Sequence, residues 1–278
     1  MRDAFPNEWA SGEVGTNGAS LRYFRSGGTG RTLVFAHGFY DNAACRLPLL
    51  SALASTYDVL AYDARGHGLS DAPPTGYSVE DRVADLTGLL DELSIKSPIL
   101  LGHSTGGNTI LAAAACQPER PHALVAIDPA GLLDIESDPA VRLSNTRDRI
   151  DEWHDYSVDE LLTVDESIRT HVEEGNERLA RLLARARLQV HPNAALVTRH
   201  GFASPEEIYP EISAPALVLR ADGEEAQRVR DRTRCDLLQN GRLVHIDGAS
   251  HTVVRDAREE ATSAIVEFLK THSSTSSR

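Results

Sequence analysis

The sequence predicts an α/β fold organised around a mostly parallel sheet. Six short apolar runs recur along the chain, and each ends in a polar residue or a glycine: RTLVFAHG, YDVLAYD, SPILLGHS, HALVAID, APALVLRAD and GRLVHID. Such runs are typical of strands that are buried on both faces of a parallel sheet. Helical patterns alternate with these runs, and strands that alternate with helices indicate β-α-β units.

The chain begins with a segment that is typical of a β-hairpin. Residues 12–27, GEVGTNGASLRYFRSG, contain two strand-like halves with Asn17 and Gly18 between them. An Asn-Gly pair adopts the positive φ angles that a two-residue hairpin turn requires. We therefore expect a hairpin ahead of the first parallel strand.

Amphipathic and small-residue patterns predict the helices. In SVEDRVADLTGLLDEL, one face carries Val79, Val83, Leu86 and Leu90, and Ser78 stands where an N-cap is expected. GNTILAAAACQ consists mainly of small residues, which allow a helix to pack closely on a sheet, and ATSAIVEFLK forms the last helix.

One region interrupts the alternation of strands and helices. Residues 132–210 have almost no strand signal, and ESIRTHVEEGNERLARLLARARLQV within them is helical and rich in charge. We expect a helical cap inserted between two strands, while residues 1–131 and 211–278 form the core domain. An insertion at this place lies above the carboxyl ends of the strands, where α/β sheets bind ligands.

Composition excludes several classes of function. The chain has 278 residues, 41% of them apolar, and a formal net charge of −13. This apolar content supports a folded core, and the acidic balance argues against binding to nucleic acid or to anionic membrane surfaces. Lysine occurs only as Lys96 and Lys270. A GC-rich genome and a high-salt cytoplasm both account for an acidic, lysine-poor surface, and the sequence leaves both open.

Cysteine spacing and the N-terminus predict a cytoplasmic protein. Cys45, Cys116 and Cys235 are far apart and show neither metal-ligand spacing nor a disulfide framework, so we expect reduced thiols. The N-terminal residues lack the apolar segment of a signal peptide, and no window reaches the roughly 18 consecutive apolar residues of a membrane span. The sequence carries no signal for an oligomeric state.

The stretch GHSTGG holds the candidate nucleophile. Gly102 and Gly106 flank Ser104 with the spacing G-x-S-x-G, between a predicted buried strand and a predicted helix. Glycines at these positions keep side chains out of a sharp turn that exposes the serine hydroxyl at the positive end of a helix. The alternative is an ordinary strand–helix turn made of small residues. The strand before it, the helix after it and a suitable histidine downstream favour the nucleophile.

A serine nucleophile needs a base and an acid, and several residues are candidates for the acid. His251 lies in HIDGASHTVVRD, between the last predicted strand and the last helix, and is the candidate base. Asp128 ends one predicted strand, Asp222 ends the next, and Glu224 follows closely. All three fall between serine and histidine, so the residues alone leave the choice open.

The oxyanion of an acyl-transfer reaction needs N–H donors. The backbone amide of Thr105, one residue after the serine, is at a helix start and is one candidate. The loop after LVFAHG should supply the second, and we favour the amide of Phe39. No metal cluster, phosphate loop or dinucleotide motif occurs, so no cofactor or metal is expected.

Four motifs together resemble those of the α/β-hydrolase fold. HGFYDN resembles the oxyanion loop of that family, YDARGHGLSD its arginine-containing loop, GHSTGG its nucleophile elbow and HIDGASHTVVRD its histidine loop. They occur in the family's order from about residue 20 to about residue 270, so the resemblance covers nearly the whole chain. It implies an eight-stranded, mostly parallel sheet with helices on both faces and a helical cap.

The chain departs from the family pattern after the seventh strand. The family usually has a glycine there with an acid three residues later, whereas here Ala221 and Glu224 take these positions, with Asp222 between them. Some members take the acid from the sixth strand, which is Asp128 in this chain. This places Asp128 slightly ahead of Asp222, with Glu224 third.

The resemblance implies hydrolysis of a small molecule through a covalent acyl-enzyme. Members that act on haloalkanes or epoxides use aspartate as the nucleophile, and this chain has Ser104. Carboxylic esters and lactones are therefore the expected substrates. Hydrolytic C–C cleavage of a diketone-type substrate is an alternative reaction. A slow-turnover binding protein that retains the three residues is an alternative of a different class.

Overall fold

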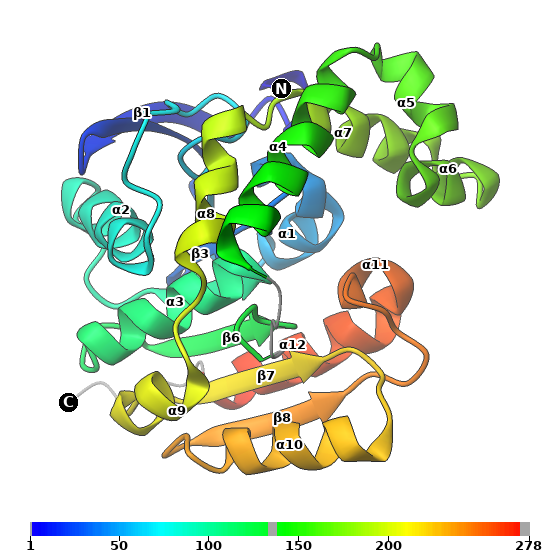
Figure 1. The fold of residues 1–278 in the computed structure, drawn as a ribbon. Coiled ribbons are helices and arrows are strands. Elements are labelled where there is room, and N and C mark those ends of the chain that lie inside the picture. Colours follow the sequence, from blue (N-terminus) through cyan, green and yellow to red (C-terminus); the bar gives the residue numbers. More distant parts are fainter. Residues whose placement is uncertain (1, 133–137, 273–278) are drawn as a thin grey trace.

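The computed structural model describes residues 2–132 and 138–272, and a single eight-stranded sheet forms its centre (Figure 1). The strands lie in the spatial order β1 (Ala10–Thr16), β2 (Ala19–Arg25), β4 (Asp58–Tyr62), β3 (Thr32–Ala36), β5 (Ile99–His103), β6 (Ala123–Ile127), β7 (Ala216–Arg220) and β8 (Gly241–His245). β1 pairs antiparallel with β2, and β2 pairs antiparallel with β4. The other neighbours are parallel, which confirms the predicted sheet and the N-terminal hairpin.

The central strands are buried on both faces, as their continuous apolar sequences predict. In β5, Ile99 and Leu101 belong to the core on one face of the sheet, while Leu100 belongs to the core on the other. Successive side chains of a strand point to opposite faces, so an uninterrupted apolar run fills both cores.

Helices cover both faces of the sheet. α1 (Leu47–Leu53) and α12 (Arg258–His272) contribute to the first core, and α2 (Val79–Glu92), α3 (Thr105–Cys116) and α10 (Glu225–Cys235) contribute to the second. The predicted start of α2 is confirmed: the Ser78 hydroxyl accepts from the Asp81 amide, and the Asp81 carboxylate accepts from the Ser78 amide. This reciprocal capping satisfies two amides that have no partner inside the helix.

A group of helices joins β6 to β7. They are α4 (Pro139–His154), α5 (Val158–Val164), α6 (Glu166–Glu173), α7 (Glu177–Leu188), α8 (Leu196–His200) and α9 (Pro205–Ile208). In Figure 1, α4 to α7 lie at the top of the view, and α9 lies apart from them near β7. Apolar side chains of α4 to α8 form a third core. The stretch 166–190 is helical as predicted, but it divides into α6 and α7. Gly175 separates them with a φ angle of 78°, which suits glycine because it has no Cβ.

Short helical turns complete the chain. They are η1 (Arg2–Ala4), η2 (Ala43–Arg46), η3 (Pro192–Ala195), η4 (Tyr209–Glu211) and α11 (Val253–Asp256).

None of the helices in residues 2–132 and 138–272 combines the length and the hydropathy needed to cross a bilayer. The three cysteines are free thiols.

Candidate active site

Ser104 occupies a sharp turn between β5 and α3. Its φ and ψ angles are 52° and −117°, a conformation that non-glycine residues rarely adopt. The flanking glycines make the turn sterically feasible. A Cβ atom on Gly102 would lie 2.5 Å from the carbonyl oxygen of Gly106, and a Cβ on Gly106 would lie 2.2 Å from that of Ala36. The G-x-S-x-G spacing therefore follows from close backbone packing.

The turn directs the Ser104 hydroxyl towards His251. The distance from Ser104 Oγ to His251 Nε2 is 2.9 Å, and the distance from His251 Nδ1 to Asp128 Oδ2 is 2.5 Å. A carboxylate accepts the Nδ1 proton, so Nε2 of a neutral imidazole is free to accept the hydroxyl proton. The histidine side chain is 54% exposed, whereas that of Asp128 is only 6% exposed. The hydroxyl is thus linked through an accessible base to a buried carboxylate.

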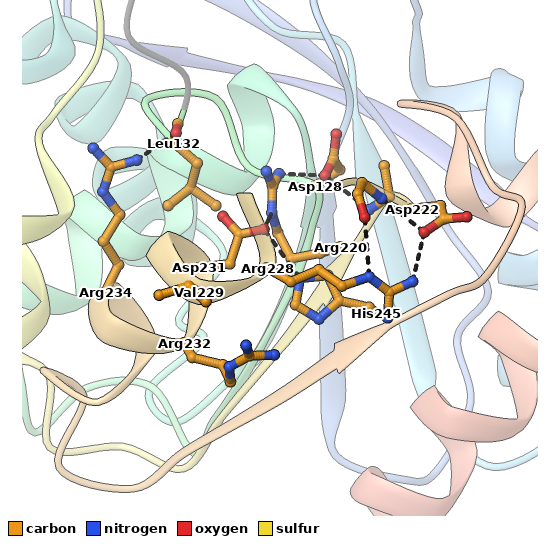
Figure 2. Close-up of polar contacts among 12 residues, drawn as sticks. Asp128, Leu132, Arg220, Asp222, Arg228, Val229, Asp231, Arg232, Arg234 and His245 are labelled. Atoms are coloured by element: carbon orange, nitrogen blue, oxygen red, sulfur yellow. Dashed lines mark hydrogen bonds and ion pairs between the residues drawn. The ribbon is translucent and has the colours of Figure 1, made fainter. Parts of the chain in front are cut away.

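A buried network holds the carboxylate oxygen of Asp128 that does not contact His251 (Figure 2). Asp128 Oδ1 accepts hydrogen bonds from the Arg220 guanidinium and from the amide of Ala221, the latter at 3.1 Å. Arg220 Nε donates to Asp231 Oδ2 at 3.0 Å, and His245 Nε2 lies 3.1 Å from the same oxygen. One carboxylate oxygen of Asp128 is therefore fixed by the last residue of β7 and the residue after it, and the other is left for His251.

Asp222 and Glu224 do not join this arrangement. Asp222 accepts from the Gly248 amide at 2.9 Å and from Arg228 at 2.5 Å, and Figure 2 shows the contact with Arg228. The Gly248 amide and then Arg228 lower the pKa of Asp222 to about 2. Glu224 stands at the N-cap of α10 without a capping hydrogen bond. In the described residues, no hydrogen bond or ion pair joins either carboxylate to His251.

His37 fixes the loop that carries the Phe39 amide. The amide of Ala64 donates to His37 Nε2 at 2.9 Å, so the ring proton is on Nδ1 and donates to the carbonyl of Gly38 at 2.8 Å. Burial lowers the pKa of His37 to about 3, which keeps the ring neutral. In a trans peptide, a carbonyl and the following N–H point in opposite directions. The Phe39 N–H therefore points away from the atoms that hold the Gly38 carbonyl.

The two amides expected to bind an oxyanion are both available. Thr105 is the first residue of α3, where the amide has no partner inside the helix. Within the described residues, no hydrogen bond occupies the N–H of Thr105 or of Phe39. Gly38 brings the loop of Phe39 close to Ser104, because a Cβ atom on Gly38 would lie 3.4 Å from the Cβ of Ser104.

A buried charged cluster behind the site was not predicted from the sequence. Asp41 Oδ1 accepts from Arg255 at 2.6 Å, and Asp41 Oδ2 lies 3.5 Å from Arg46 Nη1. Burial alone raises the pKa of Asp41, but Arg255 and Arg46 outweigh it and lower that pKa below its usual range. His103 Nδ1 lies 3.2 Å from Arg46, and its Nε2 lies 2.9 Å from the carbonyl of His251. The cluster therefore supports the histidine loop.

A cavity of about 240 Å³ lies beside the reactive groups. Its walls include Ser104, His251, Phe39, Tyr40, Arg187 and Arg255. A dry cavity of about 150 Å³ is large enough for benzene, so this space suits a small molecule. The position of Arg255, four residues after His251, is a sequence signal that could have indicated that Arg255 lies near the site. Arg187 is in α7, and nothing in the local sequence indicates that it reaches the site.

The residues that the structure describes contain no group of three or more His, Cys, Asp or Glu side chains arranged to hold a metal ion.

Comparison with known proteins gives matches along most of the chain. Residues 33–265 match the profile of the Alpha/beta hydrolase family. The 2-(acetamidomethylene)succinate hydrolase of Mesorhizobium japonicum is 30% identical over 257 residues, which are 88% of this chain and 90% of that protein. A putative non-heme haloperoxidase of Mycobacterium phage D29 is 42% identical over 104 residues, which are 37% of each chain.

Solved structures resemble this one in fold. The crystal structure of E-2-(acetamidomethylene)succinate hydrolase has a TM-score of 0.76 and 24% identity, covering 94% of this chain and 99% of that one. The enol-lactonase from Burkholderia xenovorans has a TM-score of 0.74 and 24% identity, covering 93% and 100%. At such identities the likeness shows the fold: a mostly parallel eight-stranded sheet with helices on both faces.

Proposed function

The chain belongs to the alpha/beta hydrolase family and is a hydrolase, and on this premise we propose that it cleaves a carboxylic ester or a lactone with Ser104 as the nucleophile. The observation that carries the proposal is the continuous hydrogen-bonded line from Asp128 through His251 to Ser104. A serine hydroxyl at its ordinary pKa is a weak nucleophile, and a hydrogen-bonded histidine activates it.

In the proposed reaction, His251 Nε2 takes the hydroxyl proton as Ser104 Oγ attacks the ester carbonyl carbon. The N–H groups of Phe39 and Thr105 stabilise the oxyanion that forms. His251 then returns the proton to the leaving alcohol oxygen as the C–O bond breaks, which leaves an acyl group on Ser104. A water molecule, deprotonated by His251, attacks this acyl group. As the bond between the acyl carbon and Ser104 Oγ breaks, His251 returns the proton to Oγ, and the carboxylic acid is released. Asp128 stabilises the charged imidazolium in both steps.

We assign the helices within residues 132–210 the role of a cap over the site, with residues 1–131 and 211–278 as the core domain. Support comes from Arg187, which α7 contributes to the wall of the cavity beside Ser104. On this assignment, the helices α4 to α8 shape the substrate pocket, and the strands of the core carry the reactive groups.

Two alternative functions would retain the same residues. C–C hydrolysis of a diketone-type substrate would use the same serine and histidine. The relative in Mesorhizobium japonicum is named for a substrate with an acetamido group, so an amide bond belongs in any substrate panel. A binding protein would retain the pocket but turn over slowly.

The test is turnover of a panel of activated esters, lactones, an enamide and a diketone by the native chain and by Ser104→Ala. We expect turnover of an ester or a lactone, and a loss in kcat of about 10⁴- to 10⁶-fold in the variant. Ser51→Ala, on the exposed side of α1, is the matched control and should keep full activity. A fluorophosphonate should label Ser104 in the native chain.

Fast diketone turnover with poor ester turnover would favour the C–C hydrolase. Tight ligand binding with negligible turnover of every compound would favour the binding protein. Labelling of another serine, or an active Ser104→Ala variant, would exclude Ser104 as the nucleophile.

A further inference from the structure

The cavity beside Ser104 has two arginines in its wall, although the chain carries a formal net charge of −13. Arg187 comes from α7 and Arg255 from α11, so two distant segments bring a cation to one small space. Their side chains are only 9% and 7% exposed. A buried charge is unfavourable unless it is paired and hydrogen-bonded. The ester-cleaving mechanism uses neither arginine.

Arg187 is held firmly but is poorly satisfied. Its Nη1 donates to the carbonyl of Tyr40, and its guanidinium lies over the rings of Tyr40 and Trp153, with centroid distances of 5.2 and 4.9 Å. The nearest carboxylate is that of Asp165, 3.9 Å from Nε, which is too far for a hydrogen bond. Among the described residues, Arg187 Nη2 donates no hydrogen bond. The side chain is therefore pre-organised and retains donor capacity.

Arginine side chains outnumber carboxylates in the wall of the cavity. Three guanidiniums, those of Arg46, Arg187 and Arg255, have carboxylate oxygens within 4.0 Å, and these belong to two residues of the described chain, Asp41 and Asp165. Among the described residues that line the cavity, Asp41 is the one acid. His103, which also lines the cavity, is neutral, because burial and then Arg46 lower its pKa well below the usual range. Among the described residues of its wall, the cavity thus has two guanidiniums and one carboxylate.

From this we infer that the cavity binds a carboxylate group of the substrate, with Arg187 as the main ligand and Arg255 as the second. A guanidinium presents paired N–H donors that match the two oxygens of a carboxylate. Because the same cavity borders Ser104, the substrate is a small anionic ester or lactone that carries a carboxylate near the bond to be broken. The assignment of the cleaved bond to an ester or a lactone rests on the function proposed for Ser104. The binding of a carboxylate in the cavity does not depend on that function.

Binding is tested first, without catalysis. Succinate, as the probe, is titrated calorimetrically into the native chain and into Ser104→Ala. We expect saturable binding to both, and binding that is about 10- to 100-fold weaker after Arg187→Met. Arg187→Lys, which keeps the charge but loses the fork of donors, should be intermediate. Arg181→Met is the matched control on the same helix, because Arg181 is 40% exposed and pairs with Asp159 and Glu177 on the surface.

Kinetics provides the second readout. The native chain should favour 4-nitrophenyl hemisuccinate over the methyl ester of the same compound, and Arg187→Met should reduce this ratio of kcat/KM about 10- to 100-fold. Arg181→Met should leave the ratio unchanged. Melting temperatures identify any variant that fails to fold, and competition between succinate and the neutral ester in the native chain then tests the site without a substitution.

The outcomes separate the two proposals. If both esters are hydrolysed with equal kcat/KM and succinate neither binds nor competes, the carboxylate site is wrong and the hydrolase stands. Succinate binding that is unaffected in folded Arg187→Met also overturns the site. If succinate binds through Arg187 but no ester, lactone or amide is cleaved, the function proposed for Ser104 is wrong and the carboxylate site stands.

Discussion

Replacement of Asp128 by asparagine should nearly abolish activity, while the same replacement at Asp222 should have little effect. The two carboxylates follow neighbouring strands, and the substitution is chemically identical at both. Only Asp128 lies within hydrogen-bonding distance of His251, with 2.5 Å between Oδ2 and Nδ1. Asp222 is instead engaged by Arg228 and by the amide of Gly248. The pair therefore isolates the role of the carboxylate.

The magnitude follows from the donors around Asp128. Oδ1 accepts from Arg220 and from the amide of Ala221, so an introduced carboxamide must keep its oxygen at that position. Its NH₂ group then faces His251 Nδ1 and can only donate. This forces the ring proton onto Nε2. A protonated Nε2 cannot accept the proton of the Ser104 hydroxyl. In a serine-protease triad, the equivalent tautomer change lowers kcat about 10⁴-fold, or about 5.5 kcal/mol of activation free energy.

The assay is kcat on an activated ester, with the melting temperature measured on the same preparations. Folding must be checked because breaking a buried ion pair can cost about 3–5 kcal/mol of stability. Arg220 keeps Asp231 as a partner at 3.0 Å, which limits that loss. A folded Asp128→Asn variant with near-native kcat would refute the reasoning. If Asp222→Asn were the inactive variant, the acid would lie after β7, and if both remained active, Glu224→Gln would be tested next.

Two further predictions concern stability. Gly106→Ala should lower the melting temperature strongly, because the added Cβ would lie 2.2 Å from the Ala36 carbonyl oxygen. Gly15→Ala is the control and should fold normally, because a Cβ at Gly15 would have no atom within 4 Å. Equal melting temperatures for the two variants would contradict the steric argument. The free energy of unfolding should fall as the pH drops from about 6.5 towards 3. His37 alone should contribute about 1.4 kcal/mol per pH unit. Burial lowers the pKa of His37 in the folded chain to about 3, so over this range only the unfolded chain takes up the proton. A urea midpoint that stays constant over this range would contradict it.

Much of the fold could be predicted because its signals are local. Buried parallel strands need continuous apolar runs, and the runs in the sequence coincide with the strands of the sheet. The turn at Ser104 is equally local, because the backbone contacts that exclude a side chain at Gly102 and Gly106 follow from the strand–helix geometry itself. The division of residues 166–190 into two helices was missed, although Gly175 and the Asn176 cap mark the break.

The choice of acid and the cavity wall could not be derived locally. Asp128 and Asp222 both follow apolar strands, and what distinguishes them is which donors surround each carboxylate. Those donors come from elsewhere in the sequence: Arg220 is 92 residues from Asp128, and its second partner, Asp231, is on α10. Arg187 reaches the cavity from a helical segment whose packing no periodicity predicts.

The position of Asp128 explains the arrangement at the end of β7. The residue is 5% exposed and directly follows β6, where its amide donates to the Leu219 carbonyl at 2.7 Å. A charge so deeply buried is unfavourable unless it is paired and hydrogen-bonded, and Arg220 pairs with Asp128 from the last position of β7. The guanidinium charge is in turn shared with Asp231, which also lies close to His245. Asp222, which follows β7, has a side chain that is 40% exposed, and it pairs with Arg228 instead. The buried arginine therefore accompanies the buried carboxylate that follows β6, and the two residues form one unit.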